Sequence, residues 1–219
     1  MTSFHPNEEH DITIPGGDVE LKGILCIPEE SKGIVLFVHG SGSSRFSSRN
    51  QYVAHYLNDA GLATLLFDLL TTEEEAIDAH TRHLRFDIGL LATRLILATN
   101  WCQKNLPPLK IGYFGSSTGG GAALVAAAEK SDIVKAVVSR GGRPDLAAEF
   151  LTLVQSPTLL IVGELDEEVI EMNEAAREKM HCTNQLEIVP GATHLFEEPG
   201  TLDTVANLAR DWFIKYLHS

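Results

Sequence analysis

The stretch that decides the fold is Lys110-Ile-Gly-Tyr-Phe-Gly-Ser-Ser-Thr-Gly-Gly-Gly-Ala-Ala-Leu124, an apolar run joined by a turn to an alanine-rich run. The pattern predicts a buried strand over 110–114 and a helix over 120–130. Glycine stands two residues before and two residues after Ser117, where a tight strand-to-helix turn leaves no room for a Cβ atom. This spacing selects Ser117 rather than Ser116 as a candidate nucleophile. A glycine-rich turn without chemistry is the alternative.

Apolar and helical segments alternate along the rest of the chain. This alternation predicts an α/β fold with one doubly wound, mostly parallel sheet, helices on both faces, and one or two antiparallel strands in front. Ligands bind such sheets at the carboxyl ends of the strands, so the loops after His39, Phe114, Val162 and Val189 are where chemistry is expected. The remaining predicted strands are 19–27, 33–39, 63–68, 134–139, 158–162 and 185–189, and the remaining predicted helices are 48–60, 84–104, 167–180 and 201–217.

Length and composition favour one globular domain. The chain has 219 residues, 44% of them hydrophobic and 21% charged, which excludes disordered and membrane-embedded classes. We expect a single domain over 1–219 with 1–17 as a peripheral N-terminal segment. The pieces between 68 and 84 and between 139 and 157 are too short to build a large lid domain.

The charge balance and the cysteines limit the partners and the compartment. Seventeen basic and 30 acidic residues give a net charge of −13, so binding to nucleic acid or to an anionic membrane surface is not expected. No apolar stretch reaches about 18 residues, and three widely spaced cysteines fit buried thiols rather than disulfides or a zinc site. We expect a cytoplasmic monomer or homodimer.

A serine hydroxyl needs a base, and the base needs an acid that fixes its tautomer. His194 follows the last predicted strand, and Asp166 follows the one before it, so the candidates occur in the order Ser, Asp, His that is typical of α/β-hydrolases. Glu164 is a rival acid, and a helix N-cap is the competing role for Asp166. His39, directly after a strand, is expected to shape its loop rather than to titrate.

An acyl-transfer site also needs N–H donors for the oxyanion. The backbone N–H of Thr118, directly after the nucleophile, is one candidate. The second is expected in the loop His39-Gly-Ser-Gly42, at Ser41.

Two segments have patterns that could indicate other ligands, a nucleotide and a metal ion. Gly40-Ser-Gly-Ser-Ser-Arg45 begins like a dinucleotide-binding loop, but arginine replaces its third glycine, and no Gly-Lys-Ser/Thr phosphate loop occurs. His80 and His83, near Asp78 and Asp87, have a spacing that could hold a metal, but an exposed polar segment is the favoured interpretation.

Taken together, these motifs resemble the α/β-hydrolase superfamily, and specifically its dienelactone-hydrolase-like branch. The resemblance extends over about 19–216 and rests on the motifs around Ser41, Ser117, Asp166 and His194 in the correct order. It implies a Ser117–His194–Asp166 triad with no metal or organic cofactor. Dienelactone hydrolases proper use cysteine as the nucleophile, whereas this chain has Ser117.

The expected activity is therefore metal-independent hydrolysis of small carboxylic esters or lactones through an acyl-serine intermediate. Arg45, Arg140 and Arg143 are candidates for binding a substrate carboxylate. Three alternatives stay open: a thioesterase of the same fold, a peptidase of the same fold, and a catalytically silent domain that senses a small molecule.

Overall fold

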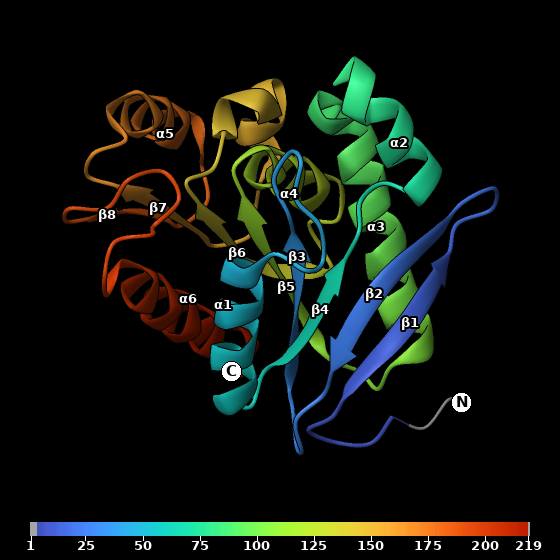
Figure 1. The fold of residues 1–219 in the computed structure, drawn as a ribbon. Helices are drawn as coiled ribbons and strands as arrows, with labels where there is room; N and C mark the ends of the chain where they lie inside the picture. Colours follow the sequence, from blue (N-terminus) through green and yellow to red (C-terminus); the bar gives the residue numbers. More distant parts are fainter. Residues whose placement is uncertain (1–3, 219) are drawn as a thin grey trace.

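One eight-stranded sheet runs through the protein in the computed structural model, which describes residues 4–218 (Figure 1). Its strand order is β1-β2-β4-β3-β5-β6-β7-β8, with β1, β2 and β4 paired antiparallel and every later pair parallel. The strands are β1 (Glu9–Pro15), β2 (Glu20–Cys26), β3 (Gly33–Val38), β4 (Ala63–Phe67), β5 (Lys110–Ser116), β6 (Val134–Arg140), β7 (Thr158–Gly163) and β8 (Asn184–Val189).

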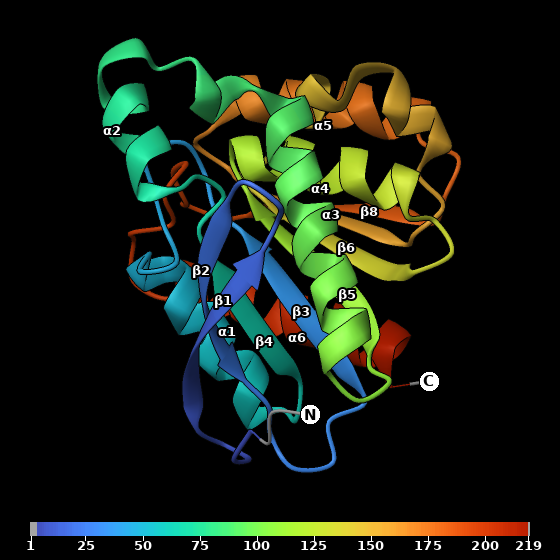
Figure 2. The ribbon, with the colours of Figure 1, turned by 90° about the vertical axis from the view of Figure 1, so that its right-hand side faces the viewer.

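Helices cover both faces of this sheet, as the views in Figures 1 and 2 show. On one face α1 packs against α6, and on the other α3 packs against α4, which in turn contacts η2. The sheet is therefore buried from two sides, which explains why β3, β4 and β7 are buried along their whole length. The helical segments are α1 (Ser48–Asp59), α2 (Thr72–Thr81), η1 (Leu84–Phe86), α3 (Ile88–Asn105), α4 (Thr118–Glu129), η2 (Pro144–Leu153), α5 (Glu167–Lys179) and α6 (Thr201–Leu217).

The predicted α/β architecture is confirmed, and the predicted strands and helices coincide with the observed ones to within a few residues. Three elements were not predicted. The segment 1–17, expected to be peripheral, contributes the edge strand β1, whose Ile12 and Ile14 are buried. Helix α2 forms in a glutamate-rich run behind a capping box between Thr71 and Glu74. The turn η2 follows β6 and packs on α4 and α5.

The predicted helix over 84–104 is divided in the structure. Its first residues form the short 3₁₀ turn η1, and α3 begins at Ile88. Asp87 caps this new start, because its Oδ1 accepts a hydrogen bond from the backbone N–H of Leu90 at 2.9 Å. No helix within residues 4–218 is both long enough and apolar enough to cross a membrane.

Candidate active site

Ser117 sits at the tip of the turn between β5 and α4 in a strained backbone conformation. Its φ is 52° and its ψ is −122°, a backbone conformation that residues other than glycine rarely adopt. A Cβ atom on Gly119 would lie 2.1 Å from the carbonyl oxygen of Val38, and one on Gly115 would lie 2.5 Å from the carbonyl oxygen of Gly119. The two flanking glycines are therefore required by close packing, and they hold the serine in a conformation that costs about 1–3 kcal/mol.

His194 and Asp166 are paired at the ends of neighbouring strands. His194 Nδ1 lies 2.5 Å from Asp166 Oδ2, which leaves Nε2 available to a hydroxyl group. Asp166 occupies the N-cap position of α5, yet its side chain makes no capping hydrogen bond. Its carboxylate is turned to the imidazole instead, so capping does not account for it.

Glu164, the rival acid, has a different partner. Its Oε2 accepts a hydrogen bond from the backbone N–H of Gly191 at 2.7 Å. The backbone N–H of Leu165 also donates to the carbonyl oxygen of Ala192 at 2.9 Å. These two contacts tie the loop after β7 to the loop that carries His194, and they give Glu164 a structural role.

Ser117 and His194 line the same cavity of about 260 Å³ at the carboxyl ends of the strands. The imidazole lies against Gly141, where a Cβ atom would be 3.5 Å from His194 Nδ1. The hydrogen bonds within residues 4–218 do not include one between Ser117 Oγ and His194. Contacts of this kind often tighten only when substrate binds.

The two expected oxyanion donors lie beside the serine. A Cβ atom on Gly40 would be 3.2 Å from Ser117 Cβ, so the loop after β3 packs directly on the turn that carries Ser117. Ser41 lines the same cavity, and Thr118 is the first residue of α4. Within the described chain, neither of their backbone N–H groups donates a hydrogen bond. Both donors are therefore free to bind an oxyanion.

His39 fixes the position of that loop. It is buried, its Nε2 accepts a hydrogen bond from the backbone N–H of Leu69 at 3.1 Å, and its Nδ1 lies 2.9 Å from the carbonyl oxygen of Gly40. This arrangement fits a neutral imidazole with its proton on Nδ1. Burial lowers the pKa of His39 below its ordinary value. The residue shapes the loop, as its place in the sequence indicated.

The three arginines that the sequence singled out have different surroundings. Arg140 lines the cavity with Ser117, and its side chain is almost wholly buried. Arg45 is paired with Asp68, and Arg143 donates to Asp145 through Nε at 2.8 Å and Nη2 at 2.7 Å. Neither Arg45 nor Arg143 lines this cavity. Of the three arginines, Arg140 is the one that lies in position to contact a ligand in this cavity.

Arg49 and Asn50, which the sequence analysis did not select, also line the cavity. Both belong to the first turn of α1. A basic residue and an amide in the first turn of a helix, directly after a serine-rich loop, is a pattern that could have drawn attention to them. Without the fold, however, Arg49 is one of 17 basic residues.

A model of the Dienelactone hydrolase family matches residues 21–215. The chain belongs to this family. A solved structure described as a dienelactone hydrolase from Anabaena variabilis ATCC 29413 has 61% sequence identity and a TM-score of 0.95, over 97% of this chain and 100% of that chain. Est1E from Butyrivibrio proteoclasticus, with 19% identity and a TM-score of 0.79 over 94% of this chain and 98% of its own, shares the α/β-hydrolase fold.

Two curated relatives of this dienelactone hydrolase family member come from Mycobacterium tuberculosis strains CDC 1551 / Oshkosh and H37Rv. Both carry the name "Putative phosphoribosyl transferase". Each is 56% identical over 214 residues, which is 97% of this chain but 47% of the relative. The chain thus spans about half the length of the curated relatives that it matches.

The polar segment around His80 and His83 has a structural role in this family member. Asp78 is fully buried, and its carboxylate accepts hydrogen bonds from the backbone N–H of Leu84 at 2.7 Å and from Arg85 Nε at 2.5 Å. Within residues 4–218, no group of three or more potential metal ligands is found. The acidic residues of this segment therefore anchor α2, η1 and α3.

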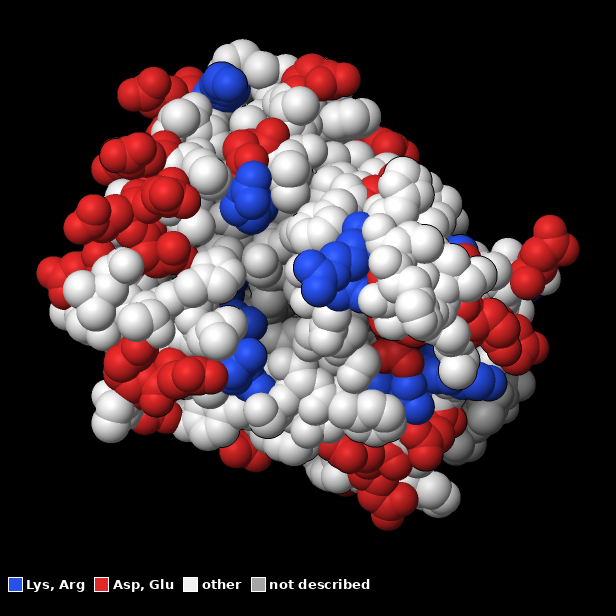
Figure 3. All heavy atoms as spheres, turned by 45° about the horizontal axis from the view of Figure 1, so that its top comes forward, with Lys and Arg blue, Asp and Glu red and all other residues white. Residues whose placement is uncertain are grey.

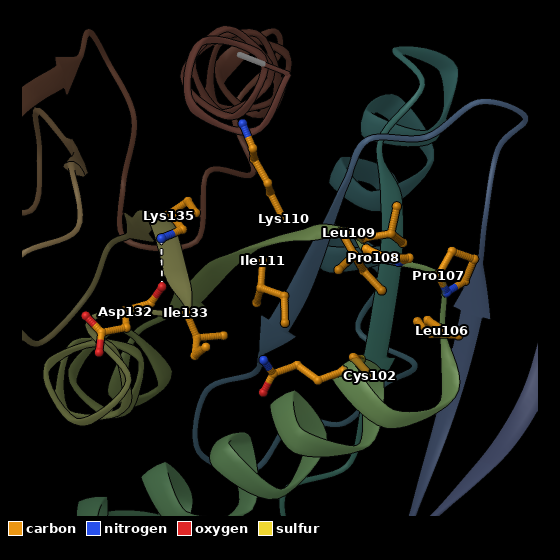
Figure 4. A pocket seen from close by; sticks show the side chains of 12 residues that line it. Cys102, Leu106, Pro107, Pro108, Leu109, Lys110, Ile111, Asp132, Ile133 and Lys135 are labelled. Carbon is orange, nitrogen blue, oxygen red and sulfur yellow. Dashed lines mark hydrogen bonds between the residues drawn. The ribbon is translucent and has the colours of Figure 1, made fainter.

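A second cavity, of about 390 Å³, lies at the opposite end of the sheet, near the start of β5 (Figure 4). Apolar side chains such as Leu109, Ile111 and Ile133 line it, and Lys135 at its edge donates to the carbonyl oxygen of Asp132 at 2.7 Å. Neither a serine nor a histidine is among its lining residues. This cavity lacks the groups that acyl transfer requires.

Proposed function

We propose that this protein is a serine hydrolase that cleaves small carboxylic esters or lactones through an acyl-enzyme on Ser117. The observation that carries the proposal is the pairing of Asp166 with His194, which lines the same cavity as a serine in a strained strand-to-helix turn. Membership of the dienelactone hydrolase family and the esterase-like fold support hydrolysis as the class of reaction.

In the first half of the reaction, Ser117 Oγ attacks the carbonyl carbon while its proton passes to His194 Nε2. The tetrahedral intermediate then collapses, the bond between the carbonyl carbon and the alcohol oxygen breaks, and His194 returns the proton to the leaving alkoxide. In the second half, water attacks the acyl-serine with His194 as general base, and the carboxylic acid leaves as Ser117 regains its proton.

Asp166 and the oxyanion donors lower the energy of the charged species in this scheme. The carboxylate keeps the proton on Nδ1 and stabilises the imidazolium that forms in each half-reaction. The backbone N–H groups of Ser41 and Thr118 would bind the oxygen that becomes negative. Losing one such donor typically costs about 10²- to 10³-fold in rate. Because side chains of this protein carry out each proton transfer, the proposed reaction requires no metal ion.

The name carried by the mycobacterial relatives describes proteins about twice as long. The site described above has the groups for acyl transfer, and hydrolysis is the activity that we assign to the part they share with this chain. The three cysteines are free thiols, which fits a reducing compartment, and we place the reaction in the cytoplasm.

The test is the variant Ser117→Ala, assayed with p-nitrophenyl acetate in the presence of a metal chelator. We expect kcat to fall by several powers of ten, up to about 10⁶-fold as in the best-studied serine hydrolase, with an unchanged circular dichroism spectrum. A fluorophosphonate should label the native protein and not the variant. Retention of more than a few per cent of the activity in Ser117→Ala would refute the assignment.

A substrate panel separates the remaining members of this reaction class. We expect kcat/KM to be higher for small esters and lactones than for an acyl-thioester or a peptide. A native protein that neither hydrolyses any of them nor reacts with the fluorophosphonate would instead fit a catalytically silent sensor.

A further inference from the structure

The cavity beside Ser117 is cationic in a strongly acidic protein. Arg49 and Arg140 line it, and its lining includes no aspartate or glutamate, although the whole chain has a net charge of −13. Figure 3 shows basic side chains at the edge of a central hollow and acidic ones mainly toward the periphery. The charge of this cavity is thus opposite to that of the rest of the protein.

Arg140 is a buried cation that has no counter-ion within the described part of the chain, residues 4–218. Only 7% of the residue is exposed, and its Nε and Nη1 find no hydrogen-bond partner among residues 4–218. Burial and the nearby charge of Arg49 lower the pKa of Arg140 to about 10. An unpaired buried charge destabilises the fold. Its presence beside Ser117 therefore indicates a ligand that neutralises the charge and accepts its hydrogen bonds.

The position of Arg140 is set by the site itself. The backbone N–H of Ser117 donates to the carbonyl oxygen of Arg140 at 3.3 Å, so the end of β6, where Arg140 is the last residue, is tied to the turn that carries Ser117. The Phe196 ring, in the loop after His194, lies 6.0 Å from the guanidinium carbon. The backbone of Arg140 thus contacts the turn that carries Ser117, and its guanidinium group lies near the loop that carries His194.

Arg49 adds a second cation at the N-terminus of α1. Its Nη1 pairs with the exposed Glu197 at 3.2 Å, but its Nε is buried without a partner. The first turn of α1 has no acidic residue, whereas helix N-termini ordinarily favour one. The backbone N–H of Asn50 donates to Ser47 Oγ at 3.3 Å, whereas the N–H groups of Ser48 and Arg49 have no backbone partner among residues 4–218. These two N–H groups and the cation favour the same ligand, an anion. The hydroxyl groups of Ser43 and Ser47 line the cavity as well.

We propose that this cavity binds an anionic group of the ester substrate, and that the group is a phosphate monoester held by Arg140 and Arg49. The proposal rests on the hydrolase function proposed above and names the class of substrate. Two guanidinium groups, a helix N-terminus and nearby hydroxyls supply more donors than the two oxygens of a carboxylate can accept. A phosphate group offers three terminal oxygens and carries a charge of about −1.5 to −2 at pH 7.

Three acetyl esters of one alcohol framework test this inference. They are acetylglycerol, which is neutral, acetylglycerate, which carries a carboxylate, and acetylglycerol phosphate. Acetate release gives kcat/KM for each. We expect kcat/KM for the phosphate ester to exceed that for the neutral ester by at least about tenfold, since hydrogen bonds between two charged groups are stronger than those between neutral groups.

The variants Arg140→Gln and Arg49→Gln identify the residues responsible. Each should lower the ratio of kcat/KM for the phosphate ester to that for the neutral ester by about 10- to 100-fold. Arg143→Gln is the matched control, because Arg143 lies three residues from Arg140 but is paired with Asp145 outside the cavity. It should leave the ratio unchanged.

A binding measurement makes the inference independent of catalysis. Inorganic phosphate should raise the melting temperature of Ser117→Ala. The double variant that also carries Arg140→Gln should show no such shift. If Arg140→Gln does not fold, Arg49→Gln provides the same comparison, because its side chain lies at a helix terminus rather than in the core.

The outcomes keep the two proposals apart. Hydrolysis that depends on Ser117 but shows no preference for the phosphate ester would overturn the anion site and leave the hydrolase function intact. Acetylglycerate as the better substrate would overturn phosphate in favour of a carboxylate. Hydrolysis of the neutral ester by Ser117→Ala would overturn the hydrolase function, while an Arg140-dependent melting shift with phosphate would still support the anion site.

Discussion

The two ends of the same sheet differ in almost every physical property. At the amino ends of the strands lies a cavity of about 390 Å³ with mostly apolar walls, and Lys135 at its edge donates to the carbonyl oxygen of Asp132. At the carboxyl ends lies a cavity of about 260 Å³ that contains a strained serine and guanidinium N–H groups without partners. The strained residue and the unpaired polar groups are concentrated in the smaller of these two cavities.

The difference teaches which features mark a functional site in this fold. An apolar cavity lowers the stability of the fold only a little. Backbone strain and unpaired buried polar groups lower it more, so they are expected mainly where function requires them. Mutations at the two ends should therefore have opposite signatures: loss of activity at the carboxyl ends, and loss of stability at the amino ends.

The largest effect expected at the carboxyl ends, beyond loss of the nucleophile itself, is that of Asp166→Asn. The amide cannot hold His194 in the tautomer that accepts the serine proton, and kcat should fall by about 10⁴-fold. Glu164→Gln is the matched control, since its amide oxygen can still accept the hydrogen bond from Gly191. It should change kcat by less than about tenfold. Equal losses in the two variants would show that the acid has been assigned incorrectly.

At the amino ends, Ile111→Ala should lower the free energy of unfolding by about 2–4 kcal/mol and leave kcat for p-nitrophenyl acetate unchanged. Ile111 is 2% exposed and lines the apolar cavity, far along β5 from Ser117. Urea denaturation and steady-state kinetics on the same preparation measure both quantities. A large loss of kcat would mean that the two ends of β5 are coupled.

Ser117→Gly should have the opposite signature. Glycine adopts a positive φ without strain, so the variant should be inactive yet more stable than Ser117→Ala by about 1 kcal/mol. Comparison with Ser117→Ala removes the contribution of the hydroxyl group. Equal melting temperatures for the two variants would show that the turn stores no strain.

The smallest effect concerns acid sensitivity. Because the pKa of His39 is lowered in the folded state, its neutral form stabilises the fold above the ordinary value of about 6.5. This contribution diminishes as the pH falls below that value and continues to diminish until the folded pKa is passed. His39→Gln should therefore lose less stability than the native protein between pH 7 and pH 5. A steeper loss in the variant would contradict this account.

The sequence alone was sufficient for the order of most elements and for the triad candidates. The glycine spacing around Ser117 and the order of Asp166 and His194 are local patterns that a single chain displays. Helix α2 and strand β1 were overlooked although signals existed: the capping box at Thr71 and the alternation of Ile12 and Ile14.

The arginines show where sequence reasoning stops. Arg45, Arg140 and Arg143 looked equivalent, since each stands in a loop or at a strand end near the expected site. Their roles separated only when the fold placed Asp68 beside the first and Asp145 beside the third, and left the second buried without a partner. Arg49 joined Arg140 from a distant helix.

By itself, then, the sequence determined the sheet, the helices and the residues capable of acyl transfer, because periodicity and turn chemistry act over a few neighbouring residues. Only the tertiary structure decided which acid pairs with His194, which arginines face the cavity, and that two cations meet where the chain as a whole is acidic. Those outcomes depend on packing and pairing between segments distant in the chain, and no local pattern encodes them.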